Sequence, residues 1–441
     1  MLRRRIEETL EAWKNDEHHN PLIIKGCRQC GKTFSVLNFA NTHYEHVVYI
    51  NFFEDPDYAS IFSGSLKVDN IVMLISALLG EKAVFVPGKT CLVLDEIQQC
   101  PNARTSLKFF KMDGRYDVIC TGSLLGIKGY REQAVSVPVG YETEITMYPL
   151  SFEEFLWANG ITPSVIEMLR NSIADITPVP EALHNKMRSL LLQYVVVGGM
   201  PAVVTEHITT HQMNKVLQMQ RDIVNGYRDD MVKYATAEDK AKIRECFDSI
   251  PRQLAKENKK FQFSLIQKNA RASKYEGSLQ WIEDAGIVNR CYNLNITELP
   301  FDGNSIDTSF KVYMSDIGLF VSMLEDGTQY DILSGSLLGY KGALYENLIA
   351  DFLGKMGRKL YYFRKDSGLE VDFVIRYKGA PALLECKATT GNTKSSKTII
   401  NHPEKYHVNL MIKLGDYNVG AGDKMITLPL YMGFLLDNRT L

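Results

Sequence analysis

The stretch that decides the fold is Gly26-Cys27-Arg28-Gln29-Cys30-Gly31-Lys32-Thr33, which has the pattern G-x-x-x-x-G-K-T. It follows a short apolar run, residues 21–25, and opens a segment of helical composition, residues 33–40. The glycines let the backbone curl so that its N–H groups face phosphates. The lysine then reaches the β- and γ-phosphates, and the threonine hydroxyl binds Mg²⁺. The stretch therefore predicts a phosphate-binding loop (P-loop) between a strand and the positive end of a helix.

A second motif, Leu92-Val93-Leu94-Asp95-Glu96, is an apolar run that ends in two carboxylates. We expect Asp95 to hold Mg²⁺ through water and Glu96 to polarise the attacking water. The next short strand ends at Thr121-Gly122-Ser123, where Thr121 and Ser123 are placed to contact the γ-phosphate or that water. A P-loop pattern alone can arise by chance, but strand, loop, helix and acidic strand in this order make the nucleotide site specific.

The other loop residues are expected to bind nucleotide through their place in the loop. Cys27 and Cys30 have C-x-x-C spacing, but both lie in a loop committed to phosphate, so we expect no metal or redox role. Arg28 and Gln29 occupy variable loop positions, and we assign no side-chain chemistry to them. The sequence identifies no arginine finger, because Arg131, the one candidate, is better explained as a surface residue.

Composition sets the outer limits of the fold. The chain has 441 residues, with 50 Lys and Arg against 52 Asp and Glu, which excludes a globally basic nucleic-acid coat but not a local basic patch. Eight cysteines are too few for a disulfide scaffold, and we expect reduced thiols in a cytoplasmic protein. The longest apolar stretch, residues 190–204, is interrupted by Gln193 and by Gly198-Gly199, so we expect neither a membrane-spanning helix nor a membrane partner.

Strands and helices alternate in the first third, which predicts a parallel sheet covered on both faces. The expected strands there are residues 21–25, 47–51, 91–95 and 118–121. Helices follow a capping box at Ser151 and Glu154, and the expected ones are residues 181–197, 212–233 and 238–254. Residues 263–293 give helix, turn, helix and strand pair, the order of a winged helix. The last third is mixed, with strands at 311–314, 360–363, 371–375 and 382–386 and a helix at 343–353.

Four charged residues stand together in the last third. Glu346 lies in a predicted helix, Asp372 in a predicted strand, and Glu385 and Lys387 on one face of the next strand. Such carboxylates make a Mg²⁺ site, with Asp372 and Glu385 as ligands, and the lysine could stabilise charge in phosphodiester hydrolysis. The same spacing also fits a surface pair of Glu385 and Lys387 beside a solvated Asp372, and the pattern alone leaves both open.

A basic segment, residues 256–274, carries Lys259, Lys260, Lys268 and Arg271 against one acidic residue, Glu257. Its helix, near residues 271–284, has its basic residues at the start, as a groove-reading helix does. A solvated helical face packed on the ATPase core explains the same charges equally well.

The chain resembles the prokaryotic AAA-type ATPases that carry an uncharacterised C-terminal domain. The matching motifs are Gly26 to Thr33, Asn51, Leu94-Asp95-Glu96, Thr121-Gly122-Ser123, Tyr148-Pro149-Leu150-Ser151-Phe152-Glu153-Glu154-Phe155, Gly198-Gly199-Met200-Pro201, Asp316-Ile317-Gly318-Leu319, Glu346-Asn347, Glu370-Val371-Asp372-Phe373 and Glu385-Cys386-Lys387. The chain departs from this family at Tyr141, where an arginine often follows the glycine, and at Cys30, where an aliphatic residue or threonine is usual.

The resemblance implies an α/β P-loop NTPase core with a parallel sheet, a helical lid, a winged-helix region and a C-terminal mixed α/β domain similar to restriction-endonuclease-like folds. The expected boundaries are 1–150, 151–236, 237–300 and 301–441. Nuclease folds of this kind use a helix glutamate, a strand aspartate and an E-x-K strand, and Glu346, Asp372, Glu385 and Lys387 match those positions. The expected cofactors are ATP and Mg²⁺, the latter held at Thr33 and Asp95.

Two functions of different class follow. In the first, ATP hydrolysis drives a DNA-processing enzyme, and the C-terminal residues cleave DNA with a metal ion. In the alternative, the chain is a nucleotide-dependent switch or binding module with a catalytically silent C-terminal domain, whose partner is DNA, another protein or a second copy. The four C-terminal residues favour the first function, whereas the near-zero net charge favours the second.

Overall fold

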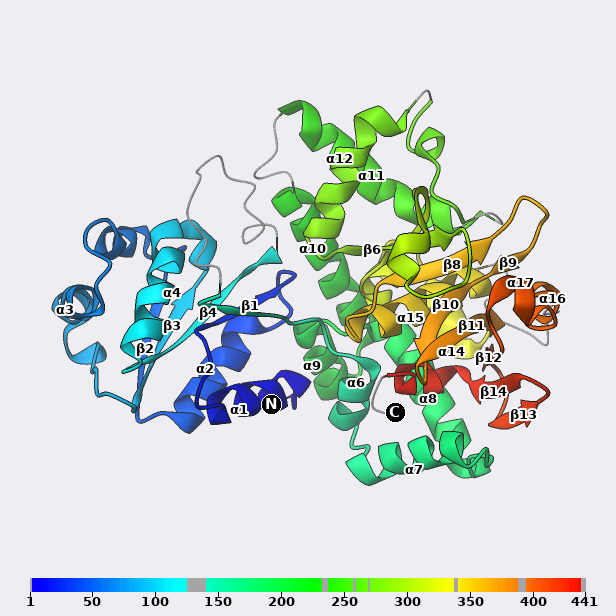
Figure 1. Ribbon diagram of the computed structural model, residues 1–441, viewed down its shortest axis with the longest axis horizontal. Coiled ribbons are helices and arrows are strands. Elements are labelled where there is room, and N and C mark those ends of the chain that lie inside the picture. Colours follow the sequence, from blue (N-terminus) through cyan, green and yellow to red (C-terminus); the bar gives the residue numbers. More distant parts are fainter. Residues whose placement is uncertain are drawn as a thin grey trace. The chain divides into compact units, whose positions relative to one another are not determined.

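The computed structural model describes residues 2–124, 140–231, 237–256, 259–268, 270–336, 340–387 and 394–437 (Figure 1). The chain divides into two compact units. The first unit consists of Met1–Pro149 with Asp284–Gly286, and the second of Leu150–Glu283 with Ile287–Leu441. Arg131, the arginine-finger candidate, lies outside the described residues.

The first unit alternates strands and helices as the sequence predicts. Its helices are α1 (Arg5–Asn15), α2 (Lys32–His43), α3 (Val68–Leu79) and α4 (Pro101–Asp113), with short 3-10 turns η1 (Pro56–Phe62), η2 (Gly80–Lys82) and η3 (Ile97–Gln99). Its strands are β1 (Leu22–Gly26), β2 (His46–Asn51), β3 (Thr90–Asp95), β4 (Asp117–Ser123) and β5 (Thr143–Thr146). These strands form one five-stranded sheet of order β2-β3-β4-β1-β5, and every pairing in it is parallel.

Side chains of this sheet pack on both faces, which explains its continuous apolar runs. On β3, Leu92 and Leu94 join one buried cluster, whereas Cys91 and Val93 join the other. Helices α3 and α4 cover the first face, and α1 and α2 cover the second. The α/β class and the P-loop NTPase arrangement of the sheet are therefore confirmed.

The second unit holds most of the helices. They are α6 (Phe152–Ala158), α7 (Pro163–Ala174), α8 (Glu181–Val197), α9 (Pro201–Thr210), α10 (Met213–Met231), α11 (Ala237–Leu254), α12 (Ala272–Asp284), α13 (Ile317–Ser322), α14 (Thr328–Ser334), α15 (Lys341–Lys355), α16 (Lys394–Ile400) and α17 (Pro403–Tyr406), with 3-10 turns η4 (Phe263–Leu265), η5 (Phe301–Asn304) and η6 (Leu430–Leu435). The capping box is present at α6, where the Ser151 hydroxyl accepts from the Glu154 N–H and the Glu154 carboxylate accepts from the Ser151 N–H.

Two further sheets complete the second unit. Their strands are β6 (Val288–Leu294), β7 (Ser305–Met314), β8 (Leu360–Arg364), β9 (Glu370–Val371), β10 (Phe373–Tyr377), β11 (Ala380–Lys387), β12 (Met411–Gly415), β13 (Gly420–Gly422) and β14 (Met425–Pro429). One sheet has the order β7-β6-β8-β9, and the other the order β10-β11-β12-β14-β13. Both mix parallel and antiparallel pairs.

Two expectations for this unit need correction. The single strand expected at 371–375 is broken at Asp372, because β9 pairs with β8 in one sheet and β10 pairs with β11 in the other. The first helix expected after residue 263 is only the three-residue turn η4, although α12 and the antiparallel pair β6–β7 follow in the predicted order. Asp372 therefore lies at the junction of two sheets.

A buried ion group, Asp316, Asp351 and Lys355, joins three of the sequence motifs. The Lys355 ammonium lies 2.7 Å from the Asp351 carboxylate and 3.2 Å from that of Asp316, and it donates to the Leu150 carbonyl at 3.1 Å. Asp316 also accepts from the Gly199 N–H at 2.7 Å. The motifs at 148–155, 198–201 and 316–319 thus meet at one buried lysine, which gives them a structural role.

The sequence also predicts reduced cysteine thiols and no membrane-spanning helix. All eight cysteines are buried free thiols. Within the described part of the chain, no helix is both long enough and apolar enough to cross a bilayer.

Candidate functional sites

The P-loop joins β1 to α2 and depends on its two glycines. A side chain at position 26 would place its Cβ 2.3 Å from the Met147 carbonyl oxygen, so only glycine fits there. Gly31 precedes α2 with φ of 95°, in the left-handed region that glycine adopts without strain. The sequence thus shapes a loop that wraps the start of a helix, where backbone N–H groups favour an anion.

Lys32, the lysine of the loop, is folded back onto the loop itself. Its ammonium donates to the carbonyl oxygens of Gly26, at 3.2 Å, and Cys27, at 2.9 Å. The side chain is buried and has no carboxylate partner among the described ion pairs. A phosphate group would be a stronger partner for this ammonium than two neutral carbonyls.

Asp95 lies at the carboxyl end of β3, beside the loop. Strand β4 separates β1 from β3, so Thr121 stands between the P-loop strand and Asp95. The Asp95 carboxylate accepts from the hydroxyls of Thr33, at 3.0 Å, and Tyr49, at 2.9 Å, and also from the Thr121 hydroxyl. Among the described residues its side-chain donors are all neutral, so its negative charge is available to a cation that Thr33 shares.

Glu96 has a backbone conformation that is costly for a residue with a side chain. Its φ is 55°, in the left-handed region, which costs of the order of 1–3 kcal/mol. The Glu96 carboxylate accepts from the Gln98 amide, and that amide lies 3.5 Å from the Ser123 hydroxyl. The structure therefore places Glu96 and Ser123, both predicted from sequence, on either side of one amide that the sequence does not identify.

The two loop cysteines interact with each other through their thiols. Cys30 is fully buried, and its thiol lies 3.5 Å from the Met147 carbonyl. A hydrogen bond from the Cys27 thiol lowers the pKa of Cys30 to about 6, with help from the charges of Lys32 and Arg4. Arg28 and Gln29 lie between them, with Gln29 in the left-handed region at φ of 62°. Across the described residues, no group of three or more His, Cys, Asp or Glu side chains is arranged to hold a metal ion.

The second unit brings the four C-terminal residues together. We call this the charged cluster, and its members are Lys259, Lys311, Glu346, Asp372, Glu385 and Lys387. Asp372 accepts from the Cys386 N–H at 2.8 Å, which fixes it beside β11. The ammonium of Lys387 lies 2.5 Å from the Glu385 carboxylate, which also accepts from the Ser396 hydroxyl. The surface-pair explanation of Glu385 is therefore wrong, since that side chain is only 3% exposed.

Glu346 is compensated by lysines that the sequence does not single out. Lys311 of β7 lies 3.5 Å from one carboxylate oxygen, the Tyr313 hydroxyl donates to the same oxygen at 3.0 Å, and Lys259 pairs with the other. Burial alone would raise the pKa of Glu346, but Lys311 and Lys259 outweigh it and hold that pKa at about 2. Burial and the charge of Glu346 raise the pKa of Asp372 to about 7. The cluster thus holds two carboxylates with very different proton affinities.

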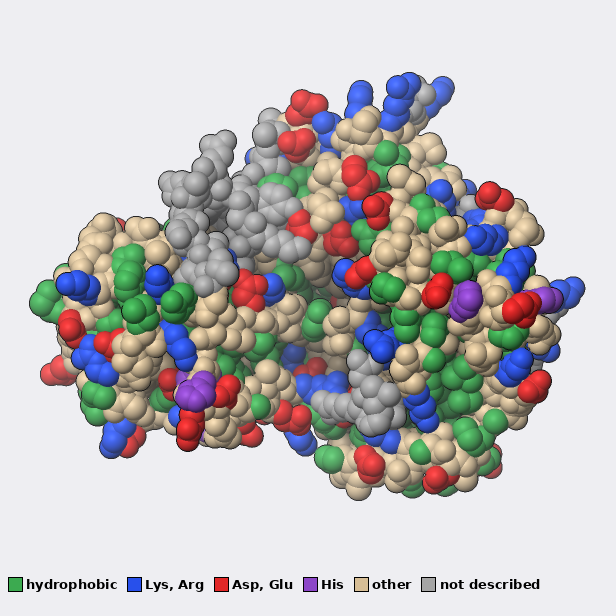
Figure 2. Space-filling model, in the orientation of Figure 1, with side chains coloured by type: hydrophobic (Ala, Val, Ile, Leu, Met, Phe, Trp, Pro, Cys, Tyr) green, Lys and Arg blue, Asp and Glu red, His purple; other side chains and the backbone are tan. Residues whose placement is uncertain are grey.

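The basic segment has most of its charges on the surface. Lys256, Lys268 and Arg271 are exposed, whereas Lys259 points inward to Glu346. In Figure 2, Lys and Arg side chains project from the end of the second unit that carries α11 and α12. The segment therefore offers positive charge both to solvent and to the charged cluster.

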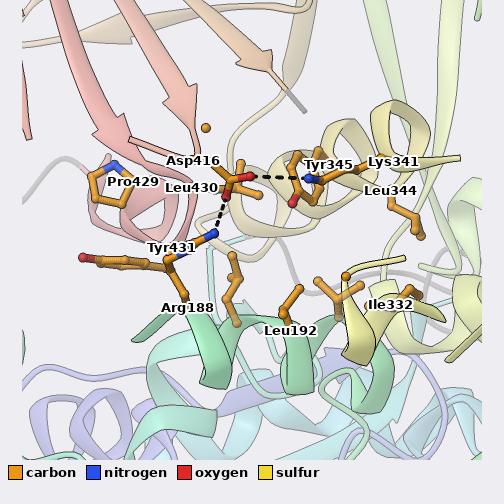
Figure 3. A pocket seen from close by; sticks show the side chains of 14 residues that line it. Arg188, Leu192, Ile332, Lys341, Leu344, Tyr345, Asp416, Pro429, Leu430 and Tyr431 are labelled. Carbon is orange, nitrogen blue, oxygen red and sulfur yellow. Dashed lines mark hydrogen bonds and ion pairs between the residues drawn. The ribbon is translucent and has the colours of Figure 1, made fainter. Parts of the chain in front are cut away.

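A separate cavity in the second unit lies among α8, α14, α15 and the region from β12 to η6 (Figure 3). Its walls include apolar side chains such as Leu192 and Ile332. At its rim Arg188 and Lys341 both pair with Asp416, at 3.2 and 3.4 Å. Because Arg188 and Lys341 are already paired with the Asp416 carboxylate, we assign the cavity no part in binding phosphate.

Three regions of the chain match known sequence families. Residues 18–156 match the family described as AAA domain. Residues 188–330 and 341–432 match two domains of unknown function, DUF8612 and DUF4143. No curated protein matches the chain in sequence. The region that holds the P-loop therefore matches the AAA domain family and has the parallel α/β sheet expected of a P-loop NTPase, whereas the expected winged helix and nuclease fold of the second unit stay predictions.

Solved structures show only a weak likeness. A Walker-type ATPase of Pyrococcus abyssi is 13% identical, with 73% of this chain and 96% of that chain covered and a TM-score of 0.43. The ORC2 protein of Aeropyrum pernix is 15% identical, with 76% of this chain and 93% of that chain covered and a TM-score of 0.37. AMPPCP-bound DnaA of Aquifex aeolicus is 11% identical, with 64% of this chain and 88% of that chain covered and a TM-score of 0.28. At such TM-scores these likenesses carry no argument about function.

Proposed function

We propose that the chain is a cytoplasmic ATPase that binds ATP with Mg²⁺ at the P-loop and hydrolyses it. The observation that carries the proposal is the pairing of Thr33 with Asp95 directly beside the loop. A hydroxyl and a carboxylate are the oxygen donors that Mg²⁺ takes in P-loop ATPases. When bound, the ion neutralises charge on the phosphates.

The roles of the residues follow from their positions. The N–H groups of residues 26–33 cradle the phosphates, and Lys32 leaves the loop carbonyls to pair with the β- and γ-phosphates. Glu96 polarises the attacking water, while Gln98 holds the Glu96 carboxylate in place. We assign Thr121 and Ser123, near the end of β4, to the γ-phosphate or the attacking water, because they lie beside Ile24 and Gly26 of the P-loop strand β1.

The test is phosphate release by the full chain with Mg²⁺. We expect Asp95→Asn to reduce turnover at least about 100-fold, because it removes the charge that holds the ion. The matched control is Asp57→Asn, an exposed carboxylate of the same unit. Equal turnover by wild type and Asp95→Asn would overturn the assignment.

A second proposal concerns the charged cluster, which fits a metal-dependent nuclease that acts on DNA bound by the winged-helix region. Its support is the burial of Glu346 and Glu385, with Asp372 and Lys387 beside them at the junction of two sheets. Asp372 and Glu385 would hold the ion, and Lys387 would stabilise the charge that develops on the cleaved phosphate. We expect plasmid cleavage with Mn²⁺ to be lost in Lys387→Met.

The alternative is a nucleotide-dependent switch. In that case the second unit binds DNA, a protein partner or a second copy of the chain without cleaving anything. It is favoured by the internal neutralisation of the charged cluster, in which every described carboxylate has a protein partner. ATP turnover without cleavage in the assay above would support it.

A further inference from the structure

Gln98, in the turn η3 beside the P-loop, has an acceptor atom without a partner. The side chain is 8% exposed. Its amide oxygen, Oε1, is buried and accepts no hydrogen bond from any residue that the structure describes. Buried polar groups in folded proteins are nearly always hydrogen-bonded, so an unsatisfied oxygen at this place needs an explanation.

The neighbours of the Gln98 amide fix its orientation. Its nitrogen donates to the Glu96 carboxylate and lies 3.5 Å from the Ser123 hydroxyl. An ionised carboxylate can only accept hydrogen bonds, so the nitrogen of the amide has to face Glu96. Turning the amide over would place Oε1 against the carboxylate, and the two oxygens would repel each other. The unpartnered oxygen is therefore a consequence of how Glu96 is held.

The turn that carries Gln98 is packed firmly. Ile97 and Cys100 belong to the buried cluster on one face of the sheet. The Gln99 N–H donates to the Glu96 carbonyl at 2.8 Å and closes the turn. Glu96 itself has the left-handed φ of 55°. The chain thus keeps a strained backbone and an unsatisfied oxygen two residues apart, and such unfavourable features concentrate at functional sites.

We propose that Gln98 is a catalytic residue of the ATPase, whose Oε1 accepts a hydrogen bond from the water that attacks the γ-phosphate. Glu96 accepts the other hydrogen of the same water. The inference rests on the proposed ATP hydrolysis and adds a second group that touches the attacking water.

Two acceptors orient a water molecule better than one. With one hydrogen on Glu96 and the other on Gln98, the water oxygen keeps a lone pair for the phosphorus. That oxygen forms a bond to the γ-phosphorus, and the bond from the phosphorus to the bridging oxygen breaks, with its electron pair going to ADP. The hydrogen on Glu96 transfers to the carboxylate, which later releases it to solvent. The hydrogen on Oε1 stays with the phosphate product.

The first test compares single-turnover ATP hydrolysis by the full chain with binding of a fluorescent ATP analogue. We expect Gln98→Leu to hydrolyse ATP at least about tenfold more slowly than wild type, because the water loses one of its two acceptors. Nucleotide affinity should stay within about twofold, because the amide is not assigned to the phosphates. Gln98→Met, which keeps the length of the side chain, should show the same result and serves if Gln98→Leu does not fold.

The control is Gln99→Leu, which removes the neighbouring, partly exposed amide of the same turn. Its hydrolysis should stay within about twofold of wild type. Hydrolysis at the wild-type rate by folded Gln98→Leu or Gln98→Met would overturn the inference.

The second test repeats the assay in a Glu96→Ala background, where there is no carboxylate for Gln98 to hold. If Oε1 binds the water, adding Gln98→Leu should lower the residual rate at least about threefold further. If Gln98 acts only by holding Glu96, the double variant hydrolyses ATP at the rate of Glu96→Ala. In that case the inference fails and the proposed ATPase stands. If wild type does not hydrolyse ATP, both fail.

Discussion

The P-loop and the charged cluster pair their carboxylates in opposite ways. At the P-loop, Asp95 accepts from hydroxyls, and the lysine of the site turns away from it to loop carbonyls. In the charged cluster, Glu346 and Glu385 are each paired with a lysine ammonium. Among the described ion pairs of the first site, the Asp95 carboxylate has no cationic partner and the Lys32 ammonium has no anionic partner. In the second site, Glu346 and Glu385 are already neutralised by lysines, so a metal ion bound to either carboxylate would compete with a lysine.

The largest effect should come from Lys32→Ala. We expect ATP turnover to fall at least about 100-fold, because the substitution removes the ammonium that we assign to the β- and γ-phosphates. Phosphate release is the measurement, and Lys89→Ala, an exposed lysine of the first unit, is the control. Turnover within about tenfold of wild type would mean that Lys32 does not pair with the phosphates.

The next largest effect is expected from Glu96→Gln, which should separate ATP binding from ATP hydrolysis. We expect Glu96→Gln to bind ATP with an affinity close to that of wild type but to hydrolyse it about 100-fold more slowly, because the amide cannot polarise water as a carboxylate does. Fluorescent-nucleotide binding and single-turnover hydrolysis measure the two steps. A large loss of affinity with normal hydrolysis would contradict the role of Glu96.

Lys355, in the buried group with Asp316 and Asp351, is a lysine to which we assign a structural role, in contrast to Lys32. Lys355 is 3% exposed and serves two buried carboxylates, so Lys355→Met should cost about 3–5 kcal/mol in the free energy of unfolding. Urea unfolding measures this, with Lys89→Met as an exposed-pair control. A loss below about 1 kcal/mol would show that the group does not fasten the second unit.

The charged cluster should also respond to pH. Because the pKa of Asp372 is raised to about 7, chiefly by burial, the metal-free protein holds a proton there below that pH. Proton and metal ion compete for the carboxylate, so Mn²⁺ affinity should fall as the pH drops from 7 to 6, by up to about tenfold, and level off above 7. Calorimetry at three pH values measures this, and Asp372→Asn should lose the dependence. Equal affinity at pH 6 and 8 would contradict it.

The smallest effect is expected at the loop cysteines. Cys27→Ala removes the thiol that donates to Cys30, but neither cysteine side chain has a part in the proposed chemistry. We expect ATP turnover within about twofold of wild type, with or without reductant. Reductant-dependent turnover in wild type that disappears in Cys27→Ala would reveal a redox role.

The sequence predicts the P-loop well because its chemistry lies in one contiguous stretch and two strand ends. It does not predict that β4 inserts between β1 and β3, because strand order in a parallel sheet is not written in chain order. Tyr49 is missed for a related reason. Only the pairing of β2 with β3, which aligns Asn51 with Asp95, brings the Tyr49 hydroxyl to that carboxylate.

The charged cluster is harder to predict because five separate segments build it. The i, i+2 spacing places Glu385 and Lys387 on one face, but nothing local predicts that Asp372 breaks its strand between two sheets. Lysines are rarely buried, so Lys311 within an apolar strand looks like a strand end rather than a counter-ion. Lys259 belongs to a surface-type basic segment, and only the fold turns it inward.

The most direct measurement of the central claim is plasmid cleavage with Mn²⁺, with and without ATP, by wild type, Lys32→Ala and Lys387→Ala. If a nucleotide-controlled nuclease is correct, Lys387→Ala loses cleavage while keeping ATP turnover, and cleavage by Lys32→Ala no longer responds to ATP. If no variant and no condition gives cleavage while wild type still turns over ATP, the nuclease claim is contradicted and the second unit is a binding module.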